Sequence, residues 1–224
     1  MKINYCLPIL KTTKKNVLQT IEKYRDEYDY FEIWLDYVID FDLVFVAKLR
    51  KLLNEKLILV LRRKDLTPTH IDVTTRLHII GRLEHSKVLL DLDIKQHKEE
   101  LVYIKKSDIP VQIIVSYHNY EKTPALALLI DEMIAARPTI LKIATHCNTE
   151  DDAIRLLQII SSLKKRHQRF IILGMGEYGT ITRVFGTLWG NEMIFAPKTL
   201  KEQSAEGQLT KKQLEKIFTE LTNK

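Results

Sequence analysis

The sequence contains few cysteines, glycines and prolines, and it lacks a long hydrophobic run. Of its 224 residues, 2 are cysteine, 7 are glycine and 6 are proline. Cys6 and Cys147 lie far apart and neither belongs to a C-x-x-C pair, which argues against a disulfide or a metal site. Both fall in apolar runs, where we expect small core residues. No window approaches the ~18 apolar residues of a membrane-spanning helix, and no tract is of low complexity.

The rest of the composition is that of an ordinary globular protein, 45% hydrophobic and 29% charged. This length suits one large domain, so we expect a single domain over residues 1–224. The first ten residues, MKINYCLPIL, hold too short an apolar run for a signal peptide. We therefore expect a soluble, cytoplasmic protein that does not bind a membrane.

The charge balance is basic, with a formal net charge of +6 and a pI of about 9.1. The lysines and arginines are scattered among acidic residues, as in KKNVLQTIEKYRDEYD. This pattern favours a solvated surface over a nucleic-acid interface, so we expect no nucleic-acid partner. Attraction of small anionic substrates is a second, weaker interpretation of the positive excess.

Short apolar runs rich in Ile, Val and Leu alternate with longer amphipathic segments. The strand-like runs are residues 3–9, 30–36, 57–63, 87–94, 111–118, 139–145, 169–175 and 192–197. The helix-like segments are residues 16–27, 43–55, 73–85, 97–107, 125–136, 150–166, 179–189 and 210–224, of which 179–189 has the weakest pattern. Nearly continuous apolar strands indicate a parallel sheet covered by helices on its faces. Eight such units predict an α/β fold of the (β/α)8 TIM-barrel class, with a doubly wound open sheet as the alternative.

The stretch GMGEYG, residues 174–179, has the spacing of a dinucleotide-binding loop. That loop belongs after the first strand of a doubly wound sheet, whereas this one follows the seventh predicted strand. No acid ends the next strand about twenty residues on, where the sequence reads FAPKTL. We therefore set the dinucleotide interpretation aside and expect these glycines to line the top of a barrel.

Lys142 stands in the middle of the apolar run PTILKIATH. A buried ammonium is costly, so burial should lower its pKa, and a partly neutral amine can form a Schiff base with a carbonyl. The alternative is a lysine that reaches solvent or pairs with a carboxylate, and the strand alone does not decide. His118 ends the preceding strand and would share a rim with Lys142, where an imidazole suits proton transfer. On its own, His118 would be interpreted as a rim residue that hydrogen-bonds a loop. Its place on the strand next to that of Lys142 favours catalysis.

Four segments in order, SYHNYEKTP, LKIAT, MGEYGTITRVFG and QSAEGQ, resemble type I 3-dehydroquinate dehydratase, the third enzyme of the shikimate pathway. The resemblance covers the whole chain and is strongest over residues 111–208. It implies a homodimeric barrel lyase without metal or cofactor, acting on the small molecule 3-dehydroquinate. It also implies that Lys142 forms the Schiff base and that His118 is the general acid and base.

The same resemblance implies the residues that hold the substrate. Arg183 would bind the carboxylate through its guanidinium. Ser204 and Gln208 would belong to a loop that closes over the substrate. Arg62 would match the arginine of the third strand and Glu32 the acid of the second. Phe195 would help to line the pocket.

Three departures from the family stand in the sequence. Trp34 occupies the arginine position of the E-x-R motif, and Glu206 replaces the proline of the closing loop. After Arg62 the family has a Glu-Gly-Gly whose acid orients the catalytic histidine, but here the residues are RKDL. Candidates for the missing partner are Asp65, Arg63, Asp91 and Asp93.

Two other functions stay open. A Schiff-base lyase of the class I aldolase type would keep Lys142 but would not account for SAEGQ or SYHNYEKTP. A divergent homologue that binds a small carboxylate with weak or no activity would account for the altered second and third strands. His70, His78 and His85 are interpreted as helix or surface residues, not metal ligands. We expect no fused shikimate dehydrogenase, since the chain stops after one barrel's worth of elements.

Overall fold

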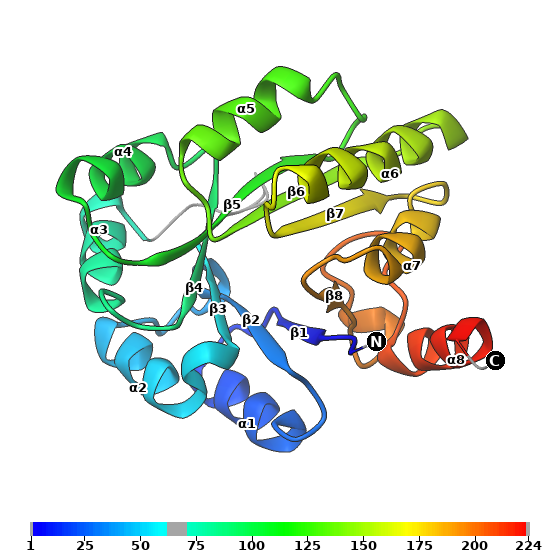
Figure 1. The fold of residues 1–224 in the computed structure, drawn as a ribbon. Helices are drawn as coiled ribbons and strands as arrows, with labels where there is room; N and C mark the ends of the chain where they lie inside the picture. The colour runs from blue at the N-terminus through cyan, green and yellow to red at the C-terminus, as the bar shows by residue number, and fades with distance from the viewer. Residues whose placement is uncertain (1, 62–70, 223–224) are drawn as a thin grey trace.

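The computed structural model describes residues 2–61 and 71–222. Within these ranges eight strands alternate with eight α-helices (Figure 1). The strands are β1 (Tyr5–Ile9), β2 (Tyr30–Trp34), β3 (Leu57–Val60), β4 (Leu89–Asp93), β5 (Gln112–Asn119), β6 (Ile140–His146), β7 (Phe170–Met175) and β8 (Ile194–Phe195). The helices are α1 (Lys14–Tyr24), α2 (Leu43–Leu53), α3 (Val73–Arg82), α4 (Lys98–Ser107), α5 (Ala127–Ala135), α6 (Glu150–Lys165), α7 (Thr180–Leu188) and α8 (Lys211–Thr222).

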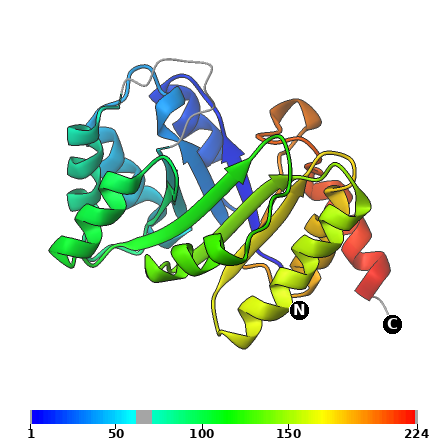
Figure 2. The ribbon, with the colours of Figure 1, turned by 90° about the horizontal axis from the view of Figure 1, so that it is seen from above.

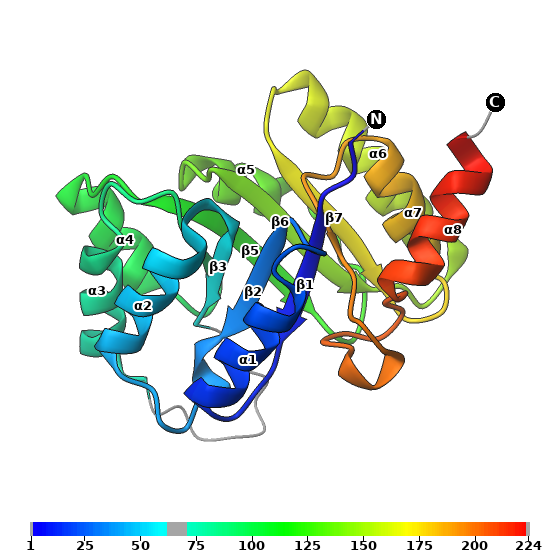
Figure 3. The same ribbon diagram turned by 90° about the horizontal axis from the view of Figure 1, so that it is seen from below.

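The strands form one parallel sheet whose order is β7-β6-β5-β4-β3-β2-β1-β8. The order follows the chain and returns β8 to the side of β1, so the sheet curls into a nearly closed barrel. Figures 2 and 3 show the helices outside the strands. The predicted (β/α)8 class is confirmed, and the doubly wound alternative is wrong because such a sheet would not bring its last strand back to its first.

A side chain completes the seam between β7 and β8. Asn191 accepts from the backbone N–H of Ile172 at 2.8 Å and donates to the carbonyl of the same residue at 3.0 Å. The backbone N–H of Glu192 donates to the carbonyl of Phe170 at 2.9 Å. The expected strand over residues 192–197 was therefore too long. On the β7 side, the Asn191 side chain makes the hydrogen bonds that a strand backbone would make. On the other side, only Ile194 and Phe195 pair with β1.

Two apolar cores lie on the two faces of the sheet. The larger core fills the space between the strands and the helices. The smaller core lies inside the barrel, and we call part of it the apolar floor; it consists of Cys6, Ile58, Leu89, Ile114, Ile140 and Ile171. Side chains alternate along each strand, so residues two positions beyond the floor also point inward. The expectation that strands are buried on both faces is confirmed, for example by β3, of which all four residues are buried.

Most helices begin where the sequence supplies a capping side chain. Thr149 and Asp152 form a reciprocal capping box at the start of α6, and Asp42 caps α2 through the N–H of Phe45. The helix expected from residue 97 starts instead at Lys98. In the described part of the chain no helix is both long and apolar enough to cross a membrane.

Candidate active site

A polar layer crosses the barrel directly above the apolar floor. Asp91, Ser116 and Lys142 each lie two residues after a floor residue on the same strand. Glu32 lies two residues after Tyr30, which packs against the floor. Alternation along a strand turns all four side chains inward, and all four residues are buried. A barrel interior of this size is filled by side chains, so charged groups placed there must meet one another.

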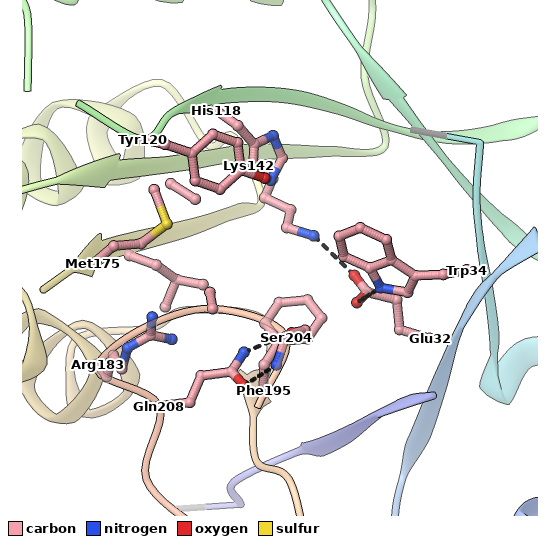
Figure 4. Close-up of a pocket in the computed structure, with 13 residues that line it drawn as sticks. Glu32, Trp34, His118, Tyr120, Lys142, Met175, Arg183, Phe195, Ser204 and Gln208 are labelled. Atoms are coloured by element: carbon pink, nitrogen blue, oxygen red, sulfur yellow. Dashed lines mark hydrogen bonds and ion pairs between the residues drawn. The ribbon is translucent and has the colours of Figure 1, made fainter. Parts of the chain in front are cut away.

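The side chain of Lys142 extends from β6 into this layer, and the residue is only 5% exposed. Its Nζ donates to Glu32 Oε1 and to Asp91 Oδ2, at 2.9 Å in each case. The same Nζ lies 4.4 Å from the centre of the Phe195 ring, within range of a cation–π contact. Figure 4 shows the amine turned into the pocket toward Glu32. The lysine therefore does not reach bulk water, but it does pair with carboxylates.

These contacts modify the expectation that burial alone would produce a neutral amine. Burial disfavours an ammonium, whereas two carboxylates at hydrogen-bond distance favour it. The ammonium must lose a proton before its nitrogen can attack a carbonyl. The two carboxylates are also the groups placed to accept that proton.

Both carboxylates are fixed by further hydrogen bonds. Asp91 Oδ1 accepts from the hydroxyl of Ser116 at 2.5 Å, and Glu32 Oε2 accepts from the indole Nε1 of Trp34 at 2.8 Å. Trp34 thus occupies the position of the arginine in the E-x-R motif and supplies a neutral N–H to the same glutamate. Its ring also forms part of the pocket wall (Figure 4).

His118 approaches the pocket from β5, next to the strand of Lys142. Lys142 pairs with Ser116, two residues before His118, so the imidazole lies one layer above the amine. The imidazole is 5% exposed, and its Nδ1 lies 3.2 Å from Asp93 Oδ2. The ring of Tyr120 stacks against it at 6.3 Å between centroids. Of the four candidates that the sequence left open, Asp93 contacts the histidine and Asp91 contacts the lysine. Arg63 and Asp65 lie outside the described residues.

Arg183 reaches the pocket from α7 and is 1% exposed. One nitrogen, Nη2, donates to the carbonyl of Glu206 at 3.1 Å. Its Nε and Nη1 have no hydrogen-bond partner among the described residues. Burial lowers the pKa of the guanidinium to about 10. A buried cation with two unused donors is suited to an anionic ligand such as a carboxylate.

The segment after β8 packs over the pocket as a self-bonded loop. The backbone N–H of Ser204 donates to Gln208 Oε1 at 3.0 Å, and Gln208 Nε2 donates to the Ser204 hydroxyl at 2.9 Å. Glu206 makes two contacts that hold the loop. Its backbone carbonyl accepts from Arg183, and its carboxylate lies 3.7 Å from Nε2 of His146. These contacts hold the loop against the site.

Together these side chains line one small cavity of ≈ 30 Å³. The thirteen lining residues are Glu32, Trp34, His118, Tyr120, Lys142, Ala144, Leu173, Met175, Arg183, Phe195, Ser204, Ala205 and Gln208.

Seven of the eight predicted site residues line this one cavity: Glu32, His118, Lys142, Arg183, Phe195, Ser204 and Gln208. Arg62 lies outside the described residues. The sequence did not single out Tyr120, Leu173 or Met175. Leu173 and Met175 could have been found only because alternation along β7 turns them inward, and Tyr120 only because it directly follows β5. The individual roles of the seven remain predictions.

The glycines after β7 serve close packing. A Cβ on Gly174 would lie 2.6 Å from the Cα of Gly179, so the end of the strand and the start of α7 touch through bare backbone. Gly176 has a φ of +77°, and a Cβ there would meet the ring of His146. The G-x-G-x-x-G spacing thus has a structural cause in this barrel.

Within residues 2–61 and 71–222 no group of three or more histidine, cysteine or acidic side chains is arranged to hold a metal ion. His78 lies on α3 and His85 lies just after it, and both are exposed. His70 lies outside the described residues.

The comparison with known families matches the type I 3-dehydroquinase model over residues 5–224. The chain belongs to the type I 3-dehydroquinase family. Two proteins named 3-dehydroquinate dehydratase resemble it over most of their length. The protein of Methanocaldococcus jannaschii is 28% identical over 220 residues, which cover 95% of this chain and 96% of that one. The protein of Methanococcus vannielii is 29% identical over 221 residues, covering 95% and 97%.

Solved structures of this family share the fold. The 3-dehydroquinate dehydratase of Geobacillus kaustophilus superposes with a TM-score of 0.82 at 20% identity, covering 100% of this chain and 93% of that one. The type I enzyme of Clostridium difficile, solved with covalently modified comenic acid, gives 0.80 at 21% identity, covering 98% and 92%. At such identities the likeness concerns the barrel itself.

Proposed function

We propose that this type I 3-dehydroquinase dehydrates 3-dehydroquinate to 3-dehydroshikimate through a Schiff base on Lys142. The observation that carries the proposal is the buried amine of Lys142 in one cavity with the imidazole of His118 and the unused donors of Arg183. An amine, a proton-transfer group and an anion site are the three functions that dehydration of a keto acid through a Schiff base uses.

The first half of the reaction joins the substrate to the enzyme. The Lys142 ammonium gives a proton to Glu32 or Asp91, each 2.9 Å away. The amine nitrogen then attacks the C3 carbonyl and forms a C–N bond. The carbonyl oxygen takes one proton from the attacking nitrogen and one from the carboxylic acid formed in the first step, and it leaves as water. A protonated imine remains on Lys142. This imine draws electrons more strongly than the ketone did.

The second half removes water from the ring. The imidazole of His118 takes the C2 proton, and the electron pair moves through C2–C3 onto the imine nitrogen. The electrons then return, the C1–oxygen bond breaks, and the hydroxyl leaves as water with the proton that His118 returns. A C1=C2 double bond is formed. Hydrolysis of the imine restores the ketone and the free lysine.

The remaining lining residues hold the substrate in this scheme. Arg183 pairs with the carboxylate, for which its Nε and Nη1 are unused donors. Ser204 and Gln208 exchange their mutual bonds for substrate oxygens as the loop tightens. Phe195 provides an apolar wall beside the amine. Arg62 is assigned to the substrate by the family resemblance alone.

Three further parts of the proposal rest on the family resemblance and the composition. They are action as one barrel domain over residues 1–224, a cytoplasmic location and assembly as a homodimer.

The conjugated product absorbs in the ultraviolet, so turnover can be followed directly. We expect the wild type to convert 3-dehydroquinate, Lys142→Ala to lose all activity, and His118→Ala to lose a factor of about 10²–10⁴. Wild-type rates in either variant would overturn the assignment. Activity on aldol substrates only would indicate an aldolase-type lyase, and binding of carboxylates without turnover would indicate a silent homologue.

A further inference from the structure

Asp93 ends β4 and contacts His118, and His97, four residues later, is bonded to Asp93. In the family an acid after the third strand orients that histidine, whereas here the residues after Arg62 read RKDL. We propose that Asp93 sets the orientation and tautomer of His118 and that His97 in turn fixes Asp93. The inference deepens the proposed function, because it assigns two positioning residues to the same reaction.

Hydrogen bonds fix the orientation of the Asp93 carboxylate. The residue ends β4 and is 2% exposed. Its Oδ1 accepts from the backbone N–H groups of Lys95 at 2.9 Å and Gln96 at 3.3 Å. Its Oδ2 is thereby directed to Nδ1 of His118 at 3.2 Å.

This contact selects the tautomer of the imidazole. A carboxylate accepts hydrogen bonds, so the ring nitrogen facing it carries the hydrogen. His118 Nδ1 therefore donates, and the lone pair that can take a substrate proton is on Nε2. A ring without this partner would exchange tautomers, and the wrong one has no base to offer.

His97 clamps Asp93 through its backbone. The N–H of Asp93 donates to Nδ1 of the His97 ring at 2.9 Å, and the N–H of His97 donates to the carbonyl of Asp93 at 2.9 Å. Both main-chain groups of the aspartate are thus bonded to one residue. The ring Nε2 lies 3.2 Å from the carbonyl of Leu61, the residue before Arg62.

These bonds require a neutral His97. Nδ1 accepts, so the hydrogen sits on Nε2, where it can bond the carbonyl of Leu61. Burial also lowers the pKa of His97, which is 2% exposed. The ring joins the ends of β3 and β4 while holding the aspartate that faces His118. His97 thus lies outside the cavity and holds Asp93, which in turn contacts the cavity residue His118.

Two substitutions at position 97 separate the clamp from general packing. An asparagine amide oxygen can stand near Nδ1 of the histidine, so His97→Asn keeps the acceptor for Asp93 and loses the bond to Leu61. His97→Gln reaches toward Leu61 and loses the acceptor for Asp93. Asp93→Asn removes the charge that faces His118 while preserving size. Asp65→Asn tests the other acid near the missing motif.

The measurements are kcat and KM for 3-dehydroquinate, together with nitrogen-15 NMR of the His118 ring in the resting protein, assigned by its loss in His118→Gln. We expect Asp93→Asn and His97→Gln to lower kcat about 10²-fold or more with KM changed less than about threefold. We expect the Nδ1–H tautomer of His118 in the wild type and a mixture in these two variants. His97→Asn should keep both the tautomer and most of kcat.

An unchanged tautomer and a kcat within about threefold of wild type in Asp93→Asn would overturn the proposal. So would a loss of the tautomer in Asp65→Asn but not in Asp93→Asn. Thermal unfolding of each variant identifies any that fails to fold, and the remaining variants then decide. If the wild type shows no turnover at all, the proposed function fails, yet the tautomer of the resting protein still tests the role of Asp93.

Discussion

Lys142 and Glu32 are 110 positions apart in the chain, and their side chains meet at 2.9 Å inside the barrel. Asp91 contacts the same nitrogen from a third strand. One cation is thus shared by two carboxylates in an enclosed space. This arrangement keeps the amine hydrogen-bonded to both carboxylates until a substrate carbonyl arrives.

The first prediction concerns the stability of this charge cluster. Lys142→Met keeps the length of the side chain but leaves Glu32 and Asp91 buried without their cation. We expect the free energy of unfolding to fall by about 3–5 kcal/mol, the usual cost of removing one partner of a buried ion pair. Chemical denaturation at pH 7 measures it. Adding Glu32→Gln and Asp91→Asn should recover most of the loss, and an unaffected Lys142→Met would show that the pair contributes little.

A second prediction separates stability from binding at Arg183. Its pKa of about 10 lies below the usual 12.5, so folding carries a charged guanidinium into the core at a cost whenever the pH is below about 10. Arg183→Met removes that charge, and we expect an equal or higher Tm than in the wild type. We expect KM to rise on the order of 10²-fold, since two charge-assisted bonds to the carboxylate are lost.

The ligand supplies the control for this prediction. A substrate-like carboxylate should raise the Tm of the wild type by mass action and leave that of Arg183→Met unchanged. A lower Tm in the variant, or an unchanged KM, would contradict the assignment of Arg183 to the substrate.

A third prediction is the response of the fold to acid through His97. Its pKa is lowered in the folded protein, first by burial, while Glu100 and Asp93 raise it and Arg76 lowers it. In the unfolded chain His97 therefore takes up a proton near pH 6.5, whereas in the folded chain it stays neutral at that pH. The free energy of unfolding falls as the pH drops below that value. Unfolding curves between pH 7 and pH 5 should show a smaller loss for His97→Asn than for the wild type. Equal losses would mean that His97 takes up its proton without opposing the fold.

Much of this fold could be predicted because strand and helix patterns are local. All eight predicted strands and all eight predicted helices lie within a few residues of their observed bounds, and residues 62–63 of the third predicted strand lie outside the described residues. The eighth strand was predicted too long because its shortness depends on Asn191, whose side chain takes the strand bonds along β7. No local sequence pattern predicts that a side chain will replace the backbone hydrogen bonds of a strand.

The sequence predicted which residues form the site, but not which of them contact one another. Asp91 and Asp93 have the same parity on β4, so the sequence places both inside and cannot say which meets His118. The answer depends on register and strand stagger, which are properties of the closed barrel. His97 was placed on a helix, yet its ring turns inward to bond Asp93 and Leu61. Such a role follows from the turn after β4 and not from periodicity.

The central claim is that the Lys142 nitrogen bonds covalently to the substrate. Incubation with 3-dehydroquinate, reduction with borohydride and mass spectrometry of the digested protein test it most directly. We expect one reduced adduct, on the peptide that contains Lys142, and none in Lys142→Ala. Product formed without any adduct, or an adduct on another lysine only, would contradict the account.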